Sequence, residues 1–297
     1  MKNLLGSLIA ILFVQISFSQ DYQSEFLKYC EAKDSIKQLD VLTKWESKNP
    51  KDAELFTSYF NYHVMKSMQE VIALTTNTPN EEAMVLKDSL NKTTAYLESQ
   101  LYYNPQELKK GFDKIDQGIT LYPNRLDMRF GKIYVLSQAL DWKNFTSEII
   151  KTIAYSATND NQWTWTNHEP YDGTEKEFLL DIQDYQYQLY NTGNDDLFIN
   201  MREIANEVLK YYPNHVESLS NLSVTYLLTG EYDKGIAPLL KAEKLNPKDY
   251  IVLGNIAQGY KLKGDKQKAI AYYKKMVQFG DENTKAFASQ QITALEE

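Results

Sequence analysis

Apolar residues recur at every third or fourth position through most of this chain, which is the period of a helix that buries one face. In the segment 52–74, for example, Leu55, Tyr59 and Tyr62 fall on one side. The pattern predicts an all-α protein in which polar turns separate amphipathic helices. The predicted helices cover residues 22–32, 35–47, 52–74, 105–122, 126–140, 145–157, 174–190, 195–211 and 284–295, besides those of two repeats at 216–283.

Turns that contain proline close four of the predicted helices, because proline cannot continue a helical hydrogen-bond pattern. Pro213 and Pro247 are 34 residues apart. Pro50 and Pro123 are 73 residues apart, and the interval from Pro123 to Pro213 is 90 residues. Since both long intervals exceed twice 34, we interpret each as two degenerate repeats plus an insertion. Asp52 is placed to cap the helix that follows Pro50.

The first expected insertion lies between residues 75 and 104. Two β-leaning runs, 84–86 and 93–97, flank a polar turn, which favours a short β-hairpin near 84–97. A helix over 81–101 fits the same residues equally well. The sequence leaves these two alternatives open.

Residues 216–249 and 250–283 are two consecutive 34-residue copies of one helix-turn-helix pattern. Ser223 and Ala257 are small where the second helix of each pair must approach closely. Gly230 and Gly264 supply the left-handed residue that lets the chain leave the first helix. The aligned pairs are Leu219 with Leu253, Leu222 with Ile256, Ser223 with Ala257, Tyr226 with Tyr260, Gly230 with Gly264, Gly235 with Ala269, and Leu239 with Tyr273.

This period and its small and aromatic positions resemble the tetratricopeptide repeat (TPR) family. The run from Phe130 to Tyr134 resembles the same pattern further upstream. The resemblance implies an α-solenoid of antiparallel helix pairs, in which each pair packs on its neighbours. The expected domains are a signal peptide (1–19), degenerate TPR-like repeats with insertions at about 75–104 and 159–173 (20–215), two clear TPR repeats (216–283) and a C-terminal capping helix (284–297).

The resemblance also implies a function, since first-helix side chains line the inner face of a TPR array. We expect a non-catalytic protein that binds a protein or peptide partner on this concave face. An asparagine amide both donates and accepts, so Asn221 and Asn255 could hold an extended peptide backbone. The predicted partner-binding residues are Asn221, Val224, Asn255, Gln258 and Lys261.

The second insertion, residues 159–173, has no helical period and supports an alternative function. Trp163 and Trp165 are two residues apart, so in an extended segment their rings would face the same way and could stack on a glycan or small ligand. His168 and Tyr171 would complete this ligand loop. The simpler interpretation, which we favour, is that both tryptophan rings fold back and fix the insertion to the helices.

Nothing in the sequence points strongly to catalysis. It contains no HExxH, GxSxG, phosphate-binding or dinucleotide-binding motif, and its single cysteine offers no second thiol for a metal site. Only the adjacent His168 and Glu169 could form an acid–base pair. We therefore expect no enzyme activity and no cofactor or metal.

The extreme N-terminus has the features of a secretory signal peptide. Lys2 precedes an apolar run over residues 4–18, which is too short to span a bilayer and ends in Ser17-Phe18-Ser19 before Gln20. We therefore expect an exported protein, periplasmic or secreted, with no stable membrane insertion after cleavage. The net charge of -8 argues against binding to nucleic acid. The abundance of Lys, Asn and Tyr resembles exported TPR proteins of Bacteroidetes type.

Overall fold

The computed structural model describes residues 21–78 and 83–297. The predicted signal peptide lies outside these residues. Contacts divide the chain into two compact units. The first contains the described residues up to Leu140 together with Trp163–Tyr171, and the second contains Asp141–Gln162 with Asp172–Glu297.

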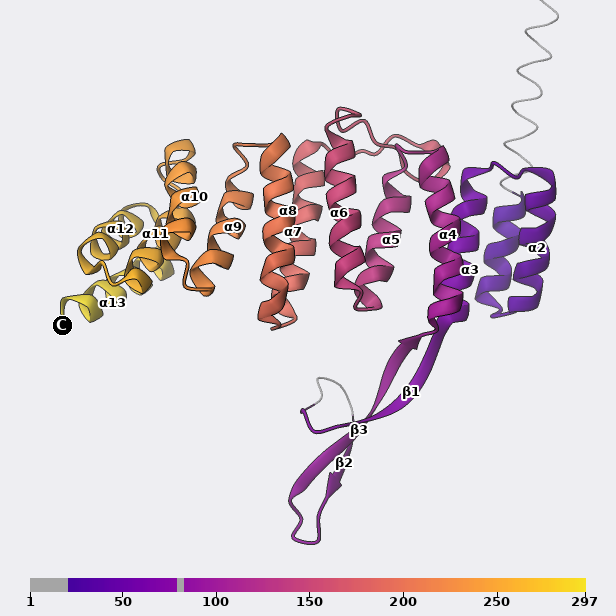
Figure 1. Ribbon diagram of the computed structural model, residues 1–297, viewed down its shortest axis with the longest axis horizontal. Helices are drawn as coiled ribbons and strands as arrows, with labels where there is room; N and C mark the ends of the chain where they lie inside the picture. The colour runs from indigo at the N-terminus through magenta and orange to yellow at the C-terminus, as the bar shows by residue number, and fades with distance from the viewer. Residues whose placement is uncertain (1–20, 79–82) are drawn as a thin grey trace, which may run out of the picture. The chain divides into compact units, whose positions relative to one another are not determined.

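Both units consist mostly of antiparallel helix pairs, so the predicted TPR-like solenoid of helix pairs is confirmed (Figure 1). The first unit contains a helix at residues 21–31, α2 (Ser35–Lys48), α3 (Ala53–Ser67), α4 (Pro105–Leu121), α5 (Leu126–Gln138) and the short 3-10 helix η1 (Thr166–His168). The second contains α6 (Trp142–Ser156), α7 (Glu175–Asn191), η2 (Asp195–Leu197), α8 (Phe198–Tyr211), α9 (Val216–Leu228), α10 (Tyr232–Leu245), α11 (Tyr250–Lys263), α12 (Lys266–Phe279) and α13 (Glu282–Glu296).

Local sequence explains where many of these helices begin and end. The side chain of Asp52 accepts a hydrogen bond from the Glu54 amide at the start of α3, and Asn104 caps α4 ahead of a proline in its first turn. Gly230 and Gly264 have φ angles of 79° and 86° in the turns after α9 and α11. The predicted left-handed turn residues are therefore confirmed.

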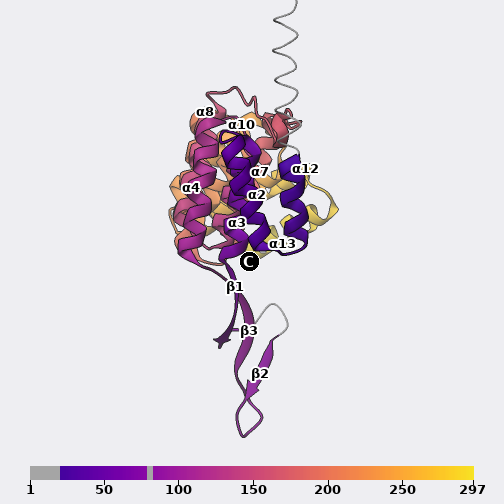
Figure 2. The ribbon, with the colours of Figure 1, turned by 90° about the vertical axis from the view of Figure 1, so that its right-hand side faces the viewer.

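The α3/α4 pair has a β-sheet in place of a short turn. Strands β1 (Met68–Thr75), β2 (Met84–Lys87) and β3 (Thr93–Tyr103) form an antiparallel sheet in the order β1-β3-β2. The sheet extends away from the ends of α3 and α4 as an arm (Figures 1 and 2). The predicted β-hairpin is confirmed as β2 and β3, and the alternative helix over 81–101 is wrong.

The third strand of the arm corrects the sequence analysis. The helix predicted over 52–74 ends at Ser67, and residues 68–75 form β1. Their main chain pairs with β3, which begins 18 residues after β1 ends and supplies partners that a helical-period argument cannot detect. The interval between Pro50 and Pro123 therefore holds one helix pair with an inserted sheet, and the interpretation as two degenerate repeats is wrong.

A second correction concerns the upstream copy of the repeat pattern. Leu140, with φ 56°, occupies the left-handed turn after α5 as Gly230 does after α9. Counting back ten residues from Gly230 reaches Ser220, and counting back ten from Leu140 reaches Phe130. Counting back seven reaches the small, buried Ser223 in the repeat but the large, buried Ile133 upstream. The resemblance of Phe130–Tyr134 to the repeat is therefore out of register, and Tyr134 is largely exposed.

The core of each unit is formed by the facing apolar stripes of its helices. In the first unit, Trp45 and Leu42 of α2 pack with Leu55 of α3. In the second, Leu239 of α10 packs with Ile256 of α11. No helix within the described residues is long and apolar enough to cross a bilayer.

Candidate functional site: an inner-face pocket of the first unit

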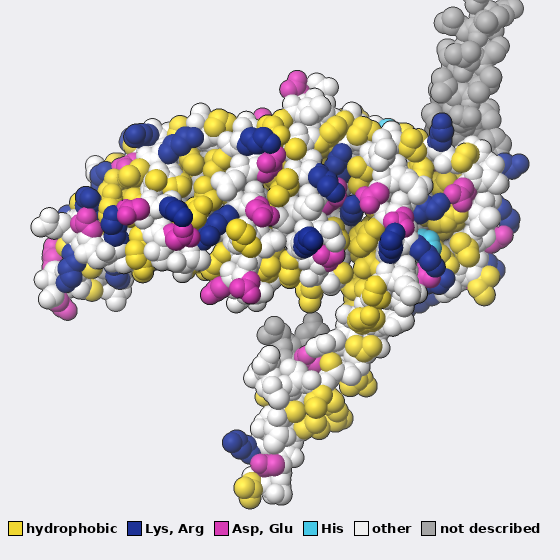
Figure 3. Space-filling model, viewed as in Figure 1, with side chains coloured by type: hydrophobic (Ala, Val, Ile, Leu, Met, Phe, Trp, Pro, Cys, Tyr) yellow, Lys and Arg dark blue, Asp and Glu magenta, His cyan; other side chains and the backbone are white. Residues whose placement is uncertain are grey.

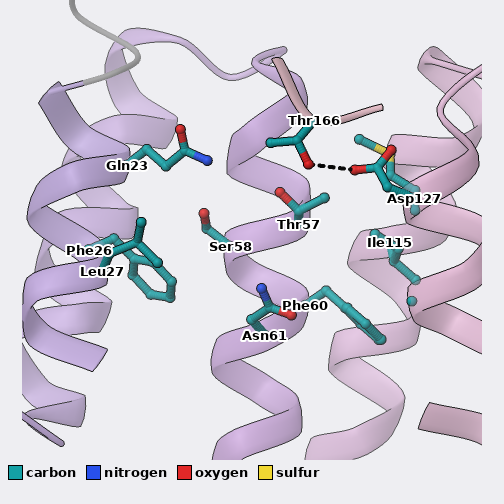
Figure 4. A pocket seen from close by; sticks show the side chains of 12 residues that line it. Gln23, Phe26, Leu27, Thr57, Ser58, Phe60, Asn61, Ile115, Asp127 and Thr166 are labelled. Carbon is teal, nitrogen blue, oxygen red and sulfur yellow. Dashed lines mark hydrogen bonds between the residues drawn. The ribbon is translucent and has the colours of Figure 1, made fainter. Parts of the chain in front are cut away.

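The first unit contains a pocket of about 220 Å³. It lies between the helix at residues 21–31, α3 and α5, with Ile115 of α4 and Thr166 of η1 at its borders (Figure 4). Three first helices of successive pairs therefore contribute to one cavity. The pocket is lined by Gln23, Phe26, Leu27, Thr57, Ser58, Phe60, Asn61, Ile115, Asp127, Met128, Gly131 and Thr166.

The lining residues of α3 occupy the inner-face positions that the sequence assigned in the C-terminal repeats. Asn61 follows the N-cap Asp52 by nine residues, just as Gln258 follows the N-cap Asp249 by nine. Ser58 and Asn255 each follow their N-cap by six residues. The pocket is thus built from the same face of the helix pair as the predicted partner-binding residues.

The pocket combines hydrogen-bonding groups with an apolar surface. The amides of Gln23 and Asn61 and the hydroxyl of Ser58 face the cavity from two helices (Figure 4). Leu27, which is 53% exposed, provides open apolar surface beside them, and the buried rings of Phe26 and Phe60 form the wall behind it. This arrangement can accept and donate hydrogen bonds while covering an apolar side chain, which is what binding an extended peptide requires.

A buried ion cluster closes the end of the pocket at Asp127. Arg125 donates from Nε and Nη2 to the two carboxylate oxygens of Asp127, at 2.8 and 2.7 Å, and from Nη1 to Glu54 Oε1 at 2.6 Å. Burial opposes the charge on Arg125, but its hydrogen bonds to Asp127 and Glu54 outweigh this and raise its pKa. Two carboxylates against one guanidinium leave the cluster with a formal charge of about -1.

The insertion segment Trp163–Tyr171 is fixed to this cluster. The Asn167 amide donates to Glu54 Oε1 at 2.8 Å, and the Thr166 hydroxyl donates to Asp127 Oδ2 at 3.4 Å. Asn167 and His168 both have positive φ angles, near 57° and 59°. Non-glycine residues are rare in this region, and the surrounding contacts must stabilise them.

The four residues of the predicted ligand loop lie in this segment with different surroundings. Trp163 is 4% exposed, and the Arg129 guanidinium lies 5.9 Å from its ring centre. Trp165 is 38% exposed and stacks on Tyr171 at 5.6 Å. His168 packs against Tyr122 and lines a second pocket of about 240 Å³. Because Trp163 is buried, the two tryptophans do not present a pair of open faces.

The predicted partner-binding residues lie on α9 and α11 in the second unit, where all five are partly exposed. Gln258 Oε1 accepts a hydrogen bond from the Tyr273 hydroxyl at 3.1 Å, and Lys261 Nζ donates to Gln291 Oε1 at 2.6 Å. These two side chains are therefore engaged by α12 and α13. Asn221, Val224 and Asn255 lie on the first helices α9 and α11, where each side chain is partly exposed.

The pocket residues of the first unit were missed by the sequence analysis. The first helices there lack the repeat's glycine turn and aromatic spacing, and α3 is separated from α4 by the arm. One signal was available, because counting from the capping residues Asp52 and Asp249 places Ser58 and Asn61 on the inner face. Among the described residues, no group of three or more His, Cys, Asp or Glu side chains is arranged to hold a metal ion.

Comparison with known proteins identifies the repeats of the second unit. A sequence model of the tetratricopeptide repeat family matches residues 216–249 and 251–278. The chain contains tetratricopeptide repeats. TPR units are generally non-catalytic scaffolds that bind protein or peptide partners.

Two curated relatives match over a short stretch. The BBSome complex member BBS4 of Bos taurus is 43% identical over 84 residues, which are 28% of this chain and 16% of that protein. The Mus musculus protein is 40% identical over 84 residues, with the same shares of each chain. The similarity thus spans about one sixth of the length of these relatives.

Solved TPR structures are similar at low sequence identity. YrrB, a TPR protein with an unusual peptide-binding site, has a TM-score of 0.41 and 13% identity, covering 84% of this chain and 97% of that chain. A TPR protein from Parabacteroides merdae has a TM-score of 0.36 and 8% identity, covering 94% and 99%. At these scores neither structure informs the binding site of this protein.

Proposed function

We propose that this TPR protein binds an extended peptide segment of a protein partner in the inner-face pocket of the first unit. The observation that carries the proposal is that the Gln23 and Asn61 amides line one pocket together with the exposed side chain of Leu27 and the buried rings of Phe26 and Phe60. The amides can donate to or accept from a peptide backbone, while Leu27 packs against one apolar side chain of the peptide.

The size of the pocket favours a segment of chain over a free small molecule. Its volume of about 220 Å³ is below the ~300–1,000 Å³ of enclosed small-molecule sites. A peptide can place one side chain in such a pocket and continue along the first helices on either side. The remaining affinity then comes from main-chain contacts outside the pocket.

The charge of the pocket indicates which peptides can bind. Among the described residues that line the pocket only Asp127 is charged, and the buried cluster behind it carries about one negative charge. The whole chain is also acidic, with a net charge of -8. We therefore propose a neutral or basic segment, because an acidic one would be repelled.

A peptide library displayed on phage and selected against the purified protein tests this function. Peptides that bind are then measured by titration calorimetry against wild type and the Asn61→Ala variant. Loss of one or two backbone hydrogen bonds, each about 1 kcal/mol, should weaken binding about 5- to 30-fold. Selected peptides should be poor in Asp and Glu.

Asn283→Ala is the matched control, because it removes the same amide from an exposed position of α13. It should leave the affinity unchanged. If selected peptides bind wild type and Asn61→Ala equally tightly, the pocket is not the binding site. If the selection yields only acidic peptides, the proposed ligand class is wrong.

For the second unit, we propose that Asn221, Val224 and Asn255 contact a partner segment along α9 and α11, with Gln258 and Lys261 contributing if their internal contacts open. Half-buried amides on successive first helices support this proposal. The double variant Asn221→Ala/Asn255→Ala should weaken the binding of those peptides whose affinity Asn61→Ala does not change. If the double variant and wild type bind every selected peptide equally tightly, α9 and α11 do not form a binding site.

We also propose that the protein is exported, periplasmic or secreted, because residues 1–19 have the composition of a signal peptide. N-terminal sequencing of protein from the envelope and medium of producing cells should begin at Gln20. An uncleaved cytosolic protein would contradict export.

A further inference from the structure

We propose that the β-sheet arm joins two copies of this protein, through antiparallel pairing of β1 with the β1 strand of the second copy. This surface is separate from the inner-face pocket, so either proposal can fail without the other. The proposal rests on the direction of the main-chain groups of β1, on the contrast between the two edges of the sheet, and on the charge pattern of the strand.

Main-chain geometry shows which groups of β1 are available. The Asn104 amide donates to the Ser67 carbonyl at 2.7 Å, just before the first strand pair, Met68 with Tyr103. Hydrogen-bonded and non-hydrogen-bonded pairs alternate in an antiparallel ladder. It follows that Val71 and Ala73 direct their main-chain groups to β3, whereas Glu70, Ile72 and Leu74 direct theirs to the outer side.

This outer side carries no neighbouring strand among the described residues, since β3 lies between β1 and β2. The side chains along it are also open, because Ile72 is 79% exposed and Leu74 is 67% exposed. Figure 3 shows hydrophobic side chains gathered on one side of the arm. An apolar edge with outward main-chain groups is the arrangement to which a further strand adds.

The other edge of the same sheet is protected. Strand β2 has four residues, contains a register shift between Leu86 and Lys87, and ends in a lysine. Short length, irregular pairing and lysine are features that prevent strands from adding to an edge. Strand β1 has eight residues, pairs with β3 without a register shift, and contains neither lysine nor proline. The sheet therefore blocks one edge and leaves the other open.

The charge pattern of β1 favours a second copy as the added strand. Glu70 is its only charged residue. A two-fold axis that pairs outward-facing residues with one another passes beside Val71 or Ile72, near the middle of the strand. Glu70 then lies opposite Ile72 or Leu74 of the second copy and never opposite the second copy's Glu70. Like charges directly across an antiparallel pair would be destabilising, and this pairing avoids them.

The same two-fold axis also continues the apolar face of the arm. Met68, Ile72 and Leu74 lie on one face together with Glu70, whose carboxylate accepts a hydrogen bond from the Ser99 hydroxyl, and a two-fold axis perpendicular to the sheet places the corresponding residues of both copies on the same face. The two arms would thus form one six-stranded sheet in which the apolar residues of both β1 strands share one face, with Glu70 of each copy among them. Closed two-fold association of this kind stops at a dimer, because both open edges are used.

Cysteine cross-linking tests the pairing directly. Val71→Cys and Ile72→Cys, each in a Cys30→Ser background, lie next to the proposed axis. Facing residues in an antiparallel pair have Cα atoms about 4.5–5.5 Å apart, within the range that a disulfide spans. At least one of the two variants should form a covalent dimer under mild oxidation. Val85→Cys, on the protected edge, should remain monomeric in denaturing gels.

Sedimentation equilibrium of the purified protein provides the second test. Wild type should show a reversible monomer–dimer equilibrium, and Ile72→Pro should raise its dissociation constant at least tenfold, because it removes an outward amide without breaking the β1–β3 ladder. Val85→Pro is the matched control: Val85 lies opposite Tyr96, whose main chain faces β1, so its own amide also points outward, from the protected edge. It should leave dimerisation unchanged.

Several outcomes would overturn the proposal. A wild-type protein that remains monomeric at concentrations of about 100 μM has no such interface. Cross-linking at Val85 but not at Val71 or Ile72 would place the contact at the β2 edge and contradict pairing through β1. Dimerisation that survives Ile72→Pro, with circular dichroism confirming a folded variant, would place the interface elsewhere.

Discussion

Arg125 and Glu54 form an ion pair in the interior of the first unit, with 2.6 Å between Nη1 and Oε1, although 71 residues separate them in the chain. Their side chains are only 1% and 5% exposed. Asp127 holds the other side of the same guanidinium, and the insertion segment adds the Asn167 amide. One buried arginine therefore connects α3, α5 and the insertion.

Replacing Arg125 with methionine should lower the free energy of unfolding by about 3–5 kcal/mol, because Glu54 and Asp127 would remain as buried charges without a cation. Urea unfolding followed by circular dichroism measures this change. Lys109→Met is the control, since its ion pair with Asp113 is exposed and such pairs contribute at most about 1 kcal/mol. Equal losses in the two variants would contradict the structural role of the cluster.

Trp163 should contribute far more to stability than Trp165. The Trp163 ring is buried, so Trp163→Ala leaves a cavity and should lower the free energy of unfolding by about 3–5 kcal/mol. Trp165 is partly exposed and packs on Phe130 and Tyr171, so its alanine variant should lose less than half as much. Thermal unfolding of both variants checks the difference. A larger loss at Trp165 would mean that the segment is anchored differently.

His63 should make the protein less stable in mild acid. Burial lowers its pKa, and this effect outweighs the nearby Glu107 carboxylate, 3.1 Å from Nδ1, while Lys110 and Lys66 lower the pKa further. An unfolded histidine has a pKa near 6.5, so below that value the unfolded state binds more protons and stability falls as pH decreases. His63→Gln should flatten the decline in unfolding free energy between pH 7 and 5.

The flattening should be partial, because burial also lowers the pKa of His215 in the second unit. His215→Gln should remove a separate part of the same decline. If neither variant changes the slope of the unfolding free energy against pH, these histidines are not buried as neutral groups.

Replacing two glycines in the helices of the first unit with alanine should change the free energy of unfolding in opposite directions. A Cβ atom at Gly118 would lie 2.9 Å from Phe56 Cβ and 3.0 Å from Met128 Sδ, so overpacking of about 1–3 kcal/mol should exceed the ~1 kcal/mol gain in helix propensity. At Gly131 the nearest atom, Phe60 Cε1, is at an ordinary 3.8 Å, and alanine should stabilise by up to about 1 kcal/mol. Chemical unfolding of both variants tests the signs.

Much of the helical framework followed from local sequence. Asp52 and Asn104 begin their helices, and Gly230 and Gly264 end theirs, because capping hydrogen bonds and left-handed turns depend on residues only a few positions away. The β2–β3 hairpin could be proposed for the same reason, since its strands are close in sequence. The alternative helix over 81–101 could not be excluded, because both predictions agree with the local preferences of these residues.

The candidate site was only partly accessible to the same reasoning. Asn61 and Ser58 occupy inner-face positions that a count from the helix cap reveals. Gln23 joins them only because the helix at residues 21–31 packs beside α3. The depth of a pocket depends on how neighbouring helices pack, and periodicity in one helix contains no such information.

The sequence by itself determined the helices, their caps and the repeat of the C-terminal pairs, since each depends on residues within about one helical turn or one 34-residue unit. Only the tertiary structure decided that residues 68–75 pair with β3 instead of extending α3, that Arg125 is held by Glu54, and that Trp163 is buried. Each of these is a contact between groups far apart along the chain, whose free energy appears only when folding brings the two together.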